Sequence, residues 1–320
     1  MPTQNDLHID KLLTDVAIAT MQSADNFIAN KVFPDVPVSD QSDKYPVIPA
    51  GDFHRDQMEK RADSTESAGG NWKVSTDSYF ADVWALHKDI GDQQRANADA
   101  EFRLNSNTTK FLAHQALNRR EAIFAATATV TGVWGTDDGT KNWTGASSTP
   151  IKDVRTASRT MQLKTGWRPN VAVLSRDVFD TLMDHPDFLA RVTNGAQQGA
   201  IGQGAAQVSK NIMAEMFDVN EVHVLDAVIN TAKEGETDSN AFHATEICLL
   251  LYVAEATGEG IPTAGLTFSW SGFLGQGGLG TRVRNIRMPA KSADRIEIEQ
   301  AFDMKVTVAD LGHLFHSVLS

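Results

Sequence analysis

The feature that most constrains the fold is a long stretch, Tyr45 to Phe80, that we interpret as a hairpin without a core of its own. Its first leg contains Pro46 and Pro49 among β-branched and aromatic residues, a mixture that favours extended backbone over helix. The second leg, Asn71 to Phe80, alternates as a strand does. Between the legs, Asp52 to Gly70 is crowded with charges and holds almost no apolar side chains. Such a hairpin is stable only where something else covers it, so the sequence predicts that it lies on another surface.

The charges at the hairpin tip and one tryptophan in the returning leg are the candidate contact residues. A charge-rich loop can also be ordinary solvated surface, but the length of this hairpin and the aromatic residues in its legs favour a partner surface. We therefore expect these candidate residues to contact another surface: Arg55, Asp56, Glu59, Lys60, Arg61, Glu66 and Trp72.

An arm is predicted before the hairpin and a long helix after it. Leu7 to Phe33 is weakly amphipathic and suggests an arm with a helical piece. Thr108 or Thr109 can cap a helix running from Lys110 to about Thr129. At roughly 1.5 Å per residue this helix would be about 30 Å long and could span a domain. Its apolar stripe is predicted to consist of Leu112, Ala116, Ile123 and Thr127, widened by Leu117 and Phe124.

The rest of the chain predicts a compact α/β portion between residues 165 and 280, followed by a final pair of strands, so the fold class is α+β. The expected helices are Ile151 to Leu163, a helix capped by Ser175 that ends at Met183, and Val208 to Phe217. The expected strands are Val171 to Leu174, Val222 to Leu225, Ile247 to Val253, Thr267 to Trp270, Thr281 to Ile286, Arg295 to Phe302 and Met304 to Val308.

A glycine-rich and glutamine-rich segment, Asn194 to Ala206, has no apolar periodicity. We interpret it as a mobile loop. The candidate functional residues in this loop are Asn194, Gly199, Gly202 and Gly204.

Composition excludes several classes of protein. A net charge of −12 argues against tight phosphate binding, which needs clustered Lys and Arg. The single cysteine, Cys248, lies in an apolar run and cannot form an internal disulfide, which fits a reducing compartment. No apolar run is long enough to span a bilayer, and the first residues lack the pattern of an export signal. We expect no association with a membrane.

Two motifs could carry chemistry, and neither has the right context. Gly275, Gly277 and Gly280 match G-x-G-x-x-G, but a strand pattern follows them where a dinucleotide site needs a helix. His313 and His316 have a spacing that could place two metal ligands on one helical face, but no third ligand is nearby in sequence. We expect no catalytic site, cofactor or metal, and hence no enzyme.

The sequence resembles the major capsid proteins of tailed bacteriophages with the Hong Kong 97 fold. The resemblance covers nearly the whole chain and is carried by the order and spacing of short segments: Phe27 to Pro34, Lys44-Tyr45, Arg55-Asp56, Ser64 to Gly70, Ser75 to Tyr79, His87 to Ile90, Pro169-Asn170, Arg176 to Phe179, His185-Pro186, Asn230 to Lys233 and Phe268 to Gly272. It implies an N-arm (1–36), an E-loop hairpin (37–82), a P domain (83–165) with a spine helix at about 110–129, an A domain (166–285), and return strands of the P domain (286–320).

The resemblance also implies a function: pentamers and hexamers that self-assemble into an icosahedral head around double-stranded DNA, without sequence-specific DNA binding. Each E-loop would lie over a neighbouring subunit, and the loop at Asn194 to Ala206 would lie at the capsomer centre. A separate scaffolding protein is expected, because only residues 1–36 precede the hairpin. The resemblance implies a portal as a further partner and allows a decoration protein. The implied location is the virion, assembled in the host cytoplasm.

Two other functions stay open. An encapsulin is a bacterial shell of the same fold that encloses enzymes. A nucleotide-binding α/β enzyme that uses the glycine turn is a more distant alternative. The Lys, Asn and carboxylate set that crosslinks some phage shells through isopeptide bonds has no match that we can identify in this sequence.

Overall fold

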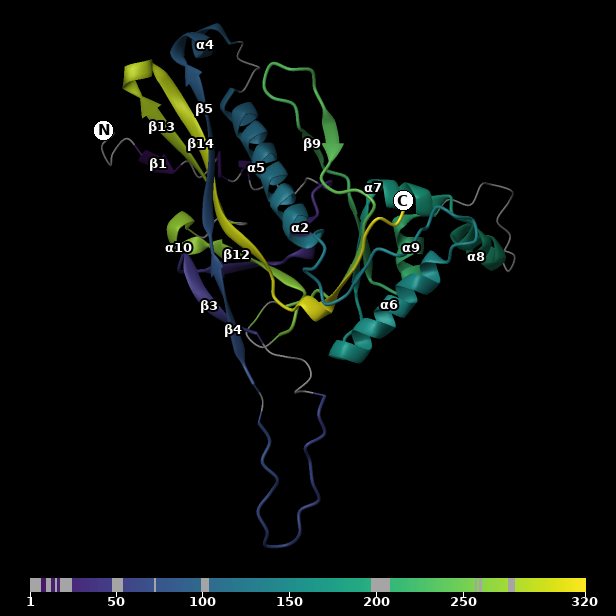
Figure 1. Cartoon of the computed structure of the whole chain (residues 1–320). Coiled ribbons are helices and arrows are strands. Elements are labelled where there is room, and N and C mark those ends of the chain that lie inside the picture. Colours follow the sequence, from purple (N-terminus) through teal and green to yellow (C-terminus); the bar gives the residue numbers. More distant parts are fainter. Residues whose placement is uncertain are drawn as a thin grey trace.

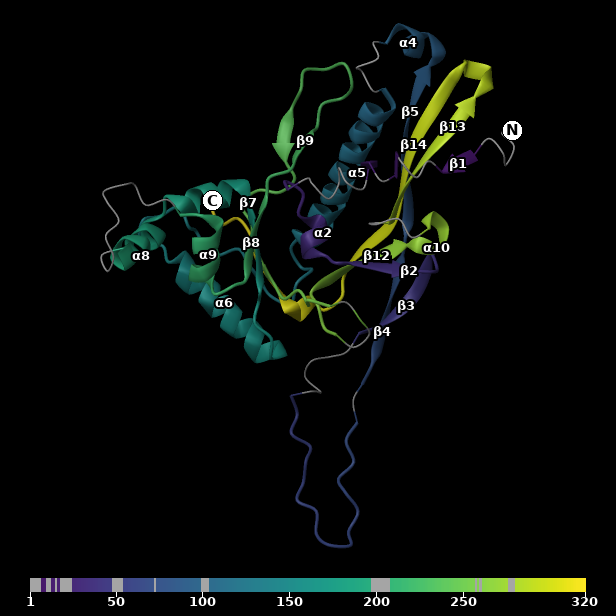
Figure 2. The same ribbon diagram turned by 180° about the vertical axis from the view of Figure 1, so that it is seen from behind.

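The structure is a computed structural model that describes residues 7–9, 13–14, 16–17, 25–47, 54–71, 73–98, 104–196, 208–256, 258, 261–275 and 280–320. Within these residues the strands form a six-stranded sheet, a five-stranded sheet and two small two-stranded sheets. Figures 1 and 2 show the two larger sheets side by side, with helix α5 (Leu104–Ala128) next to the six-stranded one. The fold class is α+β, as predicted.

The six-stranded sheet is organised around β14, a strand of 14 residues near the end of the chain. Its strands are β1 (Leu7–Ile9), β2 (Asp35–Val38), β5 (Asp82–Gly91), β12 (Gly265–Trp270), β13 (Thr281–Met288) and β14 (Ala293–Val306). Strands β13 and β5 both pair antiparallel with β14. The last residues of β14 pair with β12. The outer strands are β1, which pairs with β13, and β2, which runs parallel to β12.

Two features of this sheet differ from the sequence analysis. The expected strands Arg295 to Phe302 and Met304 to Val308 form one strand, because Asp303 stays in the ladder opposite Phe268. Strand β5 was not predicted at all. Most of its side chains are exposed, and its partner β14 lies near the other end of the chain.

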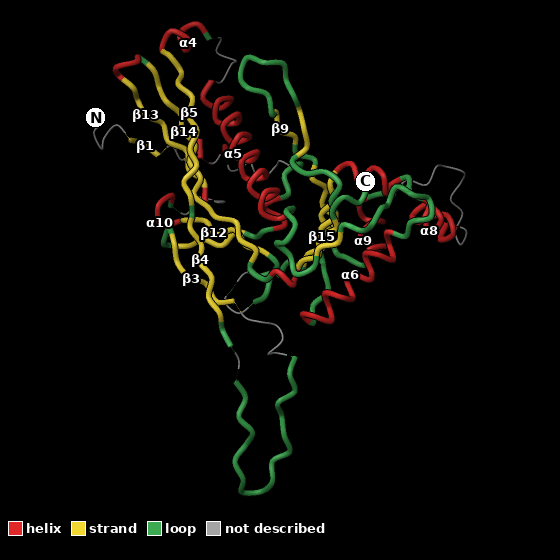
Figure 3. The backbone as a smooth tube through the Cα atoms, viewed as in Figure 1, coloured by secondary structure: helices red, strands yellow, loops and turns green. Residues whose placement is uncertain are grey.

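The predicted hairpin is confirmed. Its base consists of β3 (Ser42–Val47) and β4 (Ser75–Phe80), which pair antiparallel from Ser42 opposite Phe80 to Val47 opposite Ser75. Beyond this base the chain projects away from the rest of the molecule (Figure 1). Residues 54–71 form no strand, and all except Gln57 are exposed (Figure 3). The hairpin therefore buries no core of its own.

The predicted long helix is α5, which begins at Leu104 and not at Lys110. Neither Thr108 nor Thr109 caps it, because both are buried within the helix. The Thr109 hydroxyl donates a hydrogen bond of 2.9 Å to the Asn105 carbonyl oxygen, a bond that lets a threonine lie inside a helix.

Helix α5 connects two hydrophobic clusters. Its first half packs Leu112 and Leu117 against Ile90, Ile296 and Ile298 of the six-stranded sheet. Its last turns place Phe124 and Ala128 in a second cluster that includes Phe33, Leu249, Phe302 and Leu314. Of the predicted stripe, Ile123 and Thr127 are only half-buried, because the buried face runs through Arg120 and Glu121 instead.

The five-stranded sheet is buried on both faces. Its order is β6-β15-β11-β7-β8, formed by β6 (Asp137–Asp138), β15 (Gly312–Phe315), β11 (Cys248–Leu251), β7 (Val171–Ser175) and β8 (Glu221–Leu225). In β11, Cys248 and Leu250 join one cluster, whereas Leu249 and Leu251 face the cluster that α5 enters. The expectation of a compact portion between residues 165 and 280 was wrong in its limits, since β15 comes from the end of the chain and β12 belongs to the other sheet. Local patterns do not reveal such distant pairing.

Three of the helices on the far face of this sheet are close to their predicted positions: α6 (Pro150–Thr165), α7 (Arg176–Met183) and α9 (Lys210–Phe217). A fourth helix, α8 (Pro186–Ala196), was not predicted. Ser175 precedes α7 as predicted but does not cap it. Its hydroxyl instead donates to the Ile247 carbonyl oxygen at 3.2 Å and accepts from the Ile247 N–H at 3.0 Å. Ser209 is the N-cap of α9. Helix α4 (Asp92–Asn97) and the hairpin of β9 (Val228–Asn230) and β10 (Asn240–Phe242) were not predicted.

Candidate assembly surface

Aromatic stacking fixes the root of the hairpin on the body of the molecule. The Tyr79 ring stacks on Phe268 of β12 with ring centroids 4.5 Å apart, and the Tyr45 ring lies 5.1 Å from Phe268. The Tyr45 hydroxyl donates a hydrogen bond of 3.1 Å to Asp77. Burial, reinforced by the Asp77 carboxylate, raises the pKa of Tyr45, so this hydroxyl remains a donor. The direction in which the hairpin projects is thus set by the body.

The predicted contact residues at the tip lie together on the exposed part of the hairpin. These are Arg55, Asp56, Glu59, Lys60, Arg61 and Glu66; Trp72 lies outside the described residues. Arg61 Nε donates to the Thr65 carbonyl oxygen at 2.5 Å and so shapes the turn. In the part of the chain that the structure describes, Glu59, Lys60 and Glu66 form no ion pair. Exposed and unpaired charges of this kind are available to another surface.

The candidate loop at Asn194 to Ala206 is described only at its start. Asn194 belongs to the last turn of α8, so this helix includes the first residues of the segment that was expected to be a loop. Gly199, Gly202 and Gly204 lie outside the described residues.

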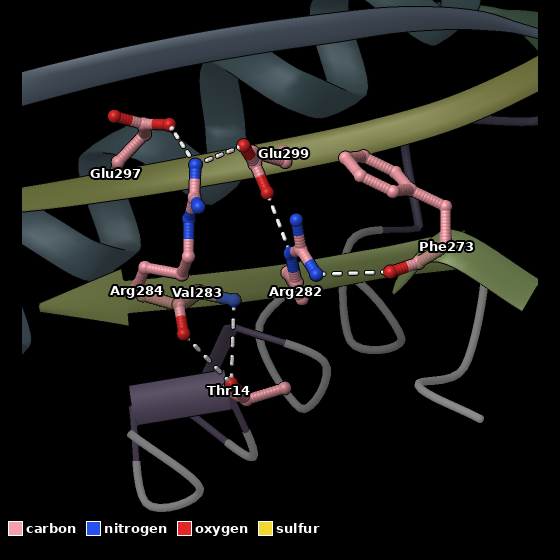
Figure 4. Close-up of polar contacts among 7 residues, drawn as sticks. All are labelled: Thr14, Phe273, Arg282, Val283, Arg284, Glu297 and Glu299. Atoms are coloured by element: carbon pink, nitrogen blue, oxygen red, sulfur yellow. Dashed lines mark hydrogen bonds and ion pairs between the residues drawn. The ribbon is translucent and has the colours of Figure 1, made fainter. Parts of the chain in front are cut away.

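The N-terminal arm covers the outer edge of β13. Strand β1 pairs with Arg284 to Ile286, and the Thr14 hydroxyl then contacts both the N–H and the carbonyl oxygen of Val283, at 3.3 and 3.5 Å (Figure 4). A side chain here takes the place of a neighbouring strand. An edge covered in this way cannot pair with another chain.

Paired charges occupy the adjacent face of β13 and β14. Arg284 bonds both Glu297, at 2.8 Å, and Glu299, while Arg282 Nε contacts Glu299 at 2.6 Å (Figure 4). Arg282 also donates to the Phe273 carbonyl oxygen and lies over the Phe273 ring. Glu299 is buried, so the ladder of opposite charges compensates a carboxylate that would otherwise be costly to bury.

The outer edge of β5 is different, because no described strand pairs with it. Three exposed large apolar side chains lie on or just before this strand: Phe80, Val83 and Leu86, with exposed fractions of 54%, 43% and 43%. An open strand edge with exposed apolar side chains is a common site of pairing with another chain.

Two buried charged residues of α5 hold the arm against the helix, and the sequence analysis missed both. Glu121 Oε2 accepts hydrogen bonds from the N–H groups of Ile28 and Ala29, at 3.1 and 3.0 Å, where helix α2 (Ala29–Val32) begins. Arg120 pairs with Asp35 at 2.9 Å. Burial raises the pKa of Glu121 to about 7, although the two N–H donors act in the opposite direction. In the sequence, the signal for these buried contacts was the presence of two adjacent charged residues, Arg120 and Glu121, inside an apolar helix face.

The motifs considered for chemistry have the following environments. Gly275 follows the short helix α10 (Ser271–Leu274) and Gly280 precedes β13, the reverse of the strand-to-helix order of a dinucleotide site, while Gly277 is not described. His313 is buried in a strand, not on a helix, and burial lowers its pKa to about 4. The described residues contain no group of three or more potential metal ligands. Among them, too, no helix is both long and apolar enough to cross a bilayer.

Comparison with known proteins gives two sequence similarities. Residues 122–258 match the family model described as phage major capsid protein E. The chain is also 25% identical over 333 residues to a major capsid protein of Pseudomonas phage JBD67, covering 98% of this chain and 97% of that protein.

Solved structures with the same fold cover almost the whole chain. A phage-related protein from Bordetella bronchiseptica RB50 has a TM-score of 0.74 at 19% identity, and the match covers 98% of each chain. The mature capsid of bacteriophage PhiM1 has a TM-score of 0.55 at 11% identity, covering 90% of this chain and 86% of that one. The SrpI encapsulin of Synechococcus elongatus PCC 7942 has a TM-score of 0.53 at 10% identity, with the same coverage. The expected Hong Kong 97-type fold is therefore confirmed.

Proposed function

We propose that this chain, a phage major capsid protein, self-assembles into the icosahedral head that encloses double-stranded phage DNA. The observation that carries the proposal is the hairpin, whose root is fixed on β12 while residues 54–71 extend away from the body without a core. Such a segment is stabilised by a neighbouring copy, and repeated contact of this kind closes rings. A chain with a net charge of −12 repels the phosphates of DNA, so the charge suits a shell that encloses DNA without binding it tightly.

The finer assignments belong to the same proposal. Copies form pentamers and hexamers, with the tip residues Arg55 to Glu66 on a neighbouring subunit and the loop at Asn194 to Ala206 at the centre of each ring. The proposed division into N-arm, E-loop, P domain and A domain keeps the expected order along the chain, but it assigns β15 to the A domain and β12 to the P domain because of the sheets in which these strands pair. A separate scaffolding protein, a portal and a decoration protein are the proposed partners, and the protein acts without catalysis, in a virion assembled in the host cytoplasm.

An encapsulin-type shell is the second candidate, favoured only by the fold similarity to the SrpI encapsulin. The two functions differ in their contents. A phage head protects double-stranded DNA from nuclease, whereas an encapsulin holds protein cargo.

The test is to isolate particles from cells that produce the chain together with the proteins encoded beside it, view them by electron microscopy, and treat them with nuclease before extraction. Closed icosahedral shells with protected double-stranded DNA are the expected result. Shells that contain a single co-purifying enzyme would support the encapsulin, and a soluble monomer under all conditions would refute both. A matched variant in which residues 54–71 are replaced by a short Gly/Ser turn should fold but not form shells.

A further inference from the structure

Two unpaired stretches of backbone on this chain are complementary. The outer edge of β5 has no strand partner among the described residues, and its N–H and C=O groups there are open to another chain. The far part of the hairpin, residues 54–71, is extended but forms no strand pair between its own legs (Figure 3). Within one molecule the two cannot meet, because the hairpin points away from β5 (Figure 1).

We infer that the part of this far segment before its turn, Asp56 to Arg61, adds as an antiparallel strand to the outer edge of β5 in a neighbouring copy, opposite Val83 to Lys88. This inference rests on the proposed function and specifies the partner surface of the hairpin. Backbone hydrogen bonds along an added strand give affinity, and side chains at alternate positions give register.

The apolar side chains select the segment that pairs and its alignment. Met58 is the most exposed large hydrophobic residue described, at 92%, and it lies in the middle of the segment before the turn, Asp56 to Arg61. The segment after the turn contains Gly69 and Gly70, which offer no side chains to a sheet. On β5, Leu86 is the central exposed apolar residue. Placing Met58 opposite Leu86 covers both side chains.

The face of β5 that Leu86 occupies is fixed by its neighbours. The ring centroid of Trp84 lies 3.9 Å from the guanidinium carbon of Arg119 in α5. Lys88 Nζ lies 5.8 Å from the ring centroid of Phe111 in the same helix. Since side chains alternate along a strand, Leu86 lies between them on the side of α5. Phe111 is itself 51% exposed and extends the apolar surface there.

Charge then decides the direction of the added strand. With Met58 opposite Leu86, an antiparallel strand places Asp56 opposite Lys88, a favourable pair on the same face. A parallel strand would place Lys60 opposite Lys88, and like charges directly opposite each other are destabilising. Asp56 and Lys88 form no ion pair among the described residues, so both are available for this contact.

Cysteine crosslinking tests the register. The natural Cys248 is fully buried and burial raises the pKa of its thiol, so it does not interfere. Assembled shells of the double variant Met58→Cys with Leu86→Cys are treated with diamide, which takes two protons and two electrons from each thiol pair as the disulfide forms. Cross-strand neighbours are about 4.5–5.5 Å apart at Cα, within disulfide range. The matched control is Met58→Cys with His87→Cys, because position 87 faces the other side of the sheet.

The expected result is a ladder of crosslinked chains in denaturing gels without reductant that ends at pentamers and hexamers, about tenfold stronger than in the control. Shells that form normally but show equal crosslinking in both variants would overturn the inference and leave the proposed function standing. Failure of the unmodified chain to form shells would instead refute the proposed function.

A charge exchange gives a second readout that does not depend on cysteines. Lys88→Asp should reduce the yield of shells because two carboxylates would then face each other, and Asp56→Lys in the same chain should restore it. Equal yields from the single and double variants would contradict the register.

Discussion

The buried carboxyl group of Glu121 should make the stability of the subunit depend on pH. Its folded pKa of about 7 lies above the ordinary value of 4.5, so between these pH values the folded chain holds a proton that the unfolded chain has released. The contribution of Glu121 to stability is therefore fully present below about pH 4.5 and is lost as the pH rises through 7. At 1.36 kcal/mol per pH unit, the full effect is about 3 kcal/mol.

Glu121→Gln separates the charge of this group from its hydrogen bonds. The amide oxygen can still accept from the Ile28 and Ala29 N–H groups, while the amide nitrogen takes the place of Glu121 Oε1, a buried atom with no hydrogen-bond partner among the described residues. At pH 8 the variant should be more stable than the natural chain by about 1–3 kcal/mol, and at pH 5 the two should agree within about 1 kcal/mol.

The assay is urea unfolding of unassembled subunits, followed by circular dichroism at pH 5 and pH 8. Glu59→Gln at the exposed hairpin tip is the matched control and should leave the pH dependence unchanged. If Glu121→Gln and the natural chain lose stability in parallel between pH 5 and pH 8, ionisation of Glu121 is not the cause and the reasoning fails.

Three further predictions concern assembly. Changing Arg55, Lys60 and Arg61 together to Glu should leave folded, soluble subunits but few shells by light scattering, since each exposed ion pair is worth only about 0–1 kcal/mol but the shell repeats it many times; normal assembly would show that the tip is merely solvated. A short Gly/Ser tag inserted between Asn194 and Ala206 should preserve assembly, and a complete block would count against the proposed place of that loop. Particles boiled in detergent with and without reductant should give one band near 34.8 kDa, because Cys248 is buried, whereas a ladder in both lanes would reveal a covalent link between subunits.

The sequence predicted features that depend on local patterns. The hairpin at Tyr45 to Phe80 was evident from its prolines, charges and alternation, and the helices after Pro150 and after Ser175 were placed within a few residues. Strand β5 was missed because an edge strand with exposed side chains on both faces lacks the alternation that marks a half-buried strand.

The partners of the charged residues inside the molecule could not be predicted for a related reason. Arg120 and Glu121 are buried because their partners, Asp35 and the start of α2, come from the distant arm. Their side chains therefore interrupt the apolar stripe by which the helix was recognised. The same holds for β15, whose place beside β11 depends on pairing between segments far apart in the sequence.

The continuity of the hairpin with the sheet has a mechanical consequence. Only Ala81 separates β4 from β5, so the second leg of the hairpin runs directly into the strand that pairs with β14 over ten residues. In the proposed head, outward pressure from the enclosed DNA would apply tension at the tip, and this tension would be directed along β5. The ladder bonds lie across that direction and are sheared together, which takes more force than peeling them apart one at a time. Strand β5, whose outer edge is open to a neighbouring copy, thus transmits force to the body through its other edge, which pairs with β14.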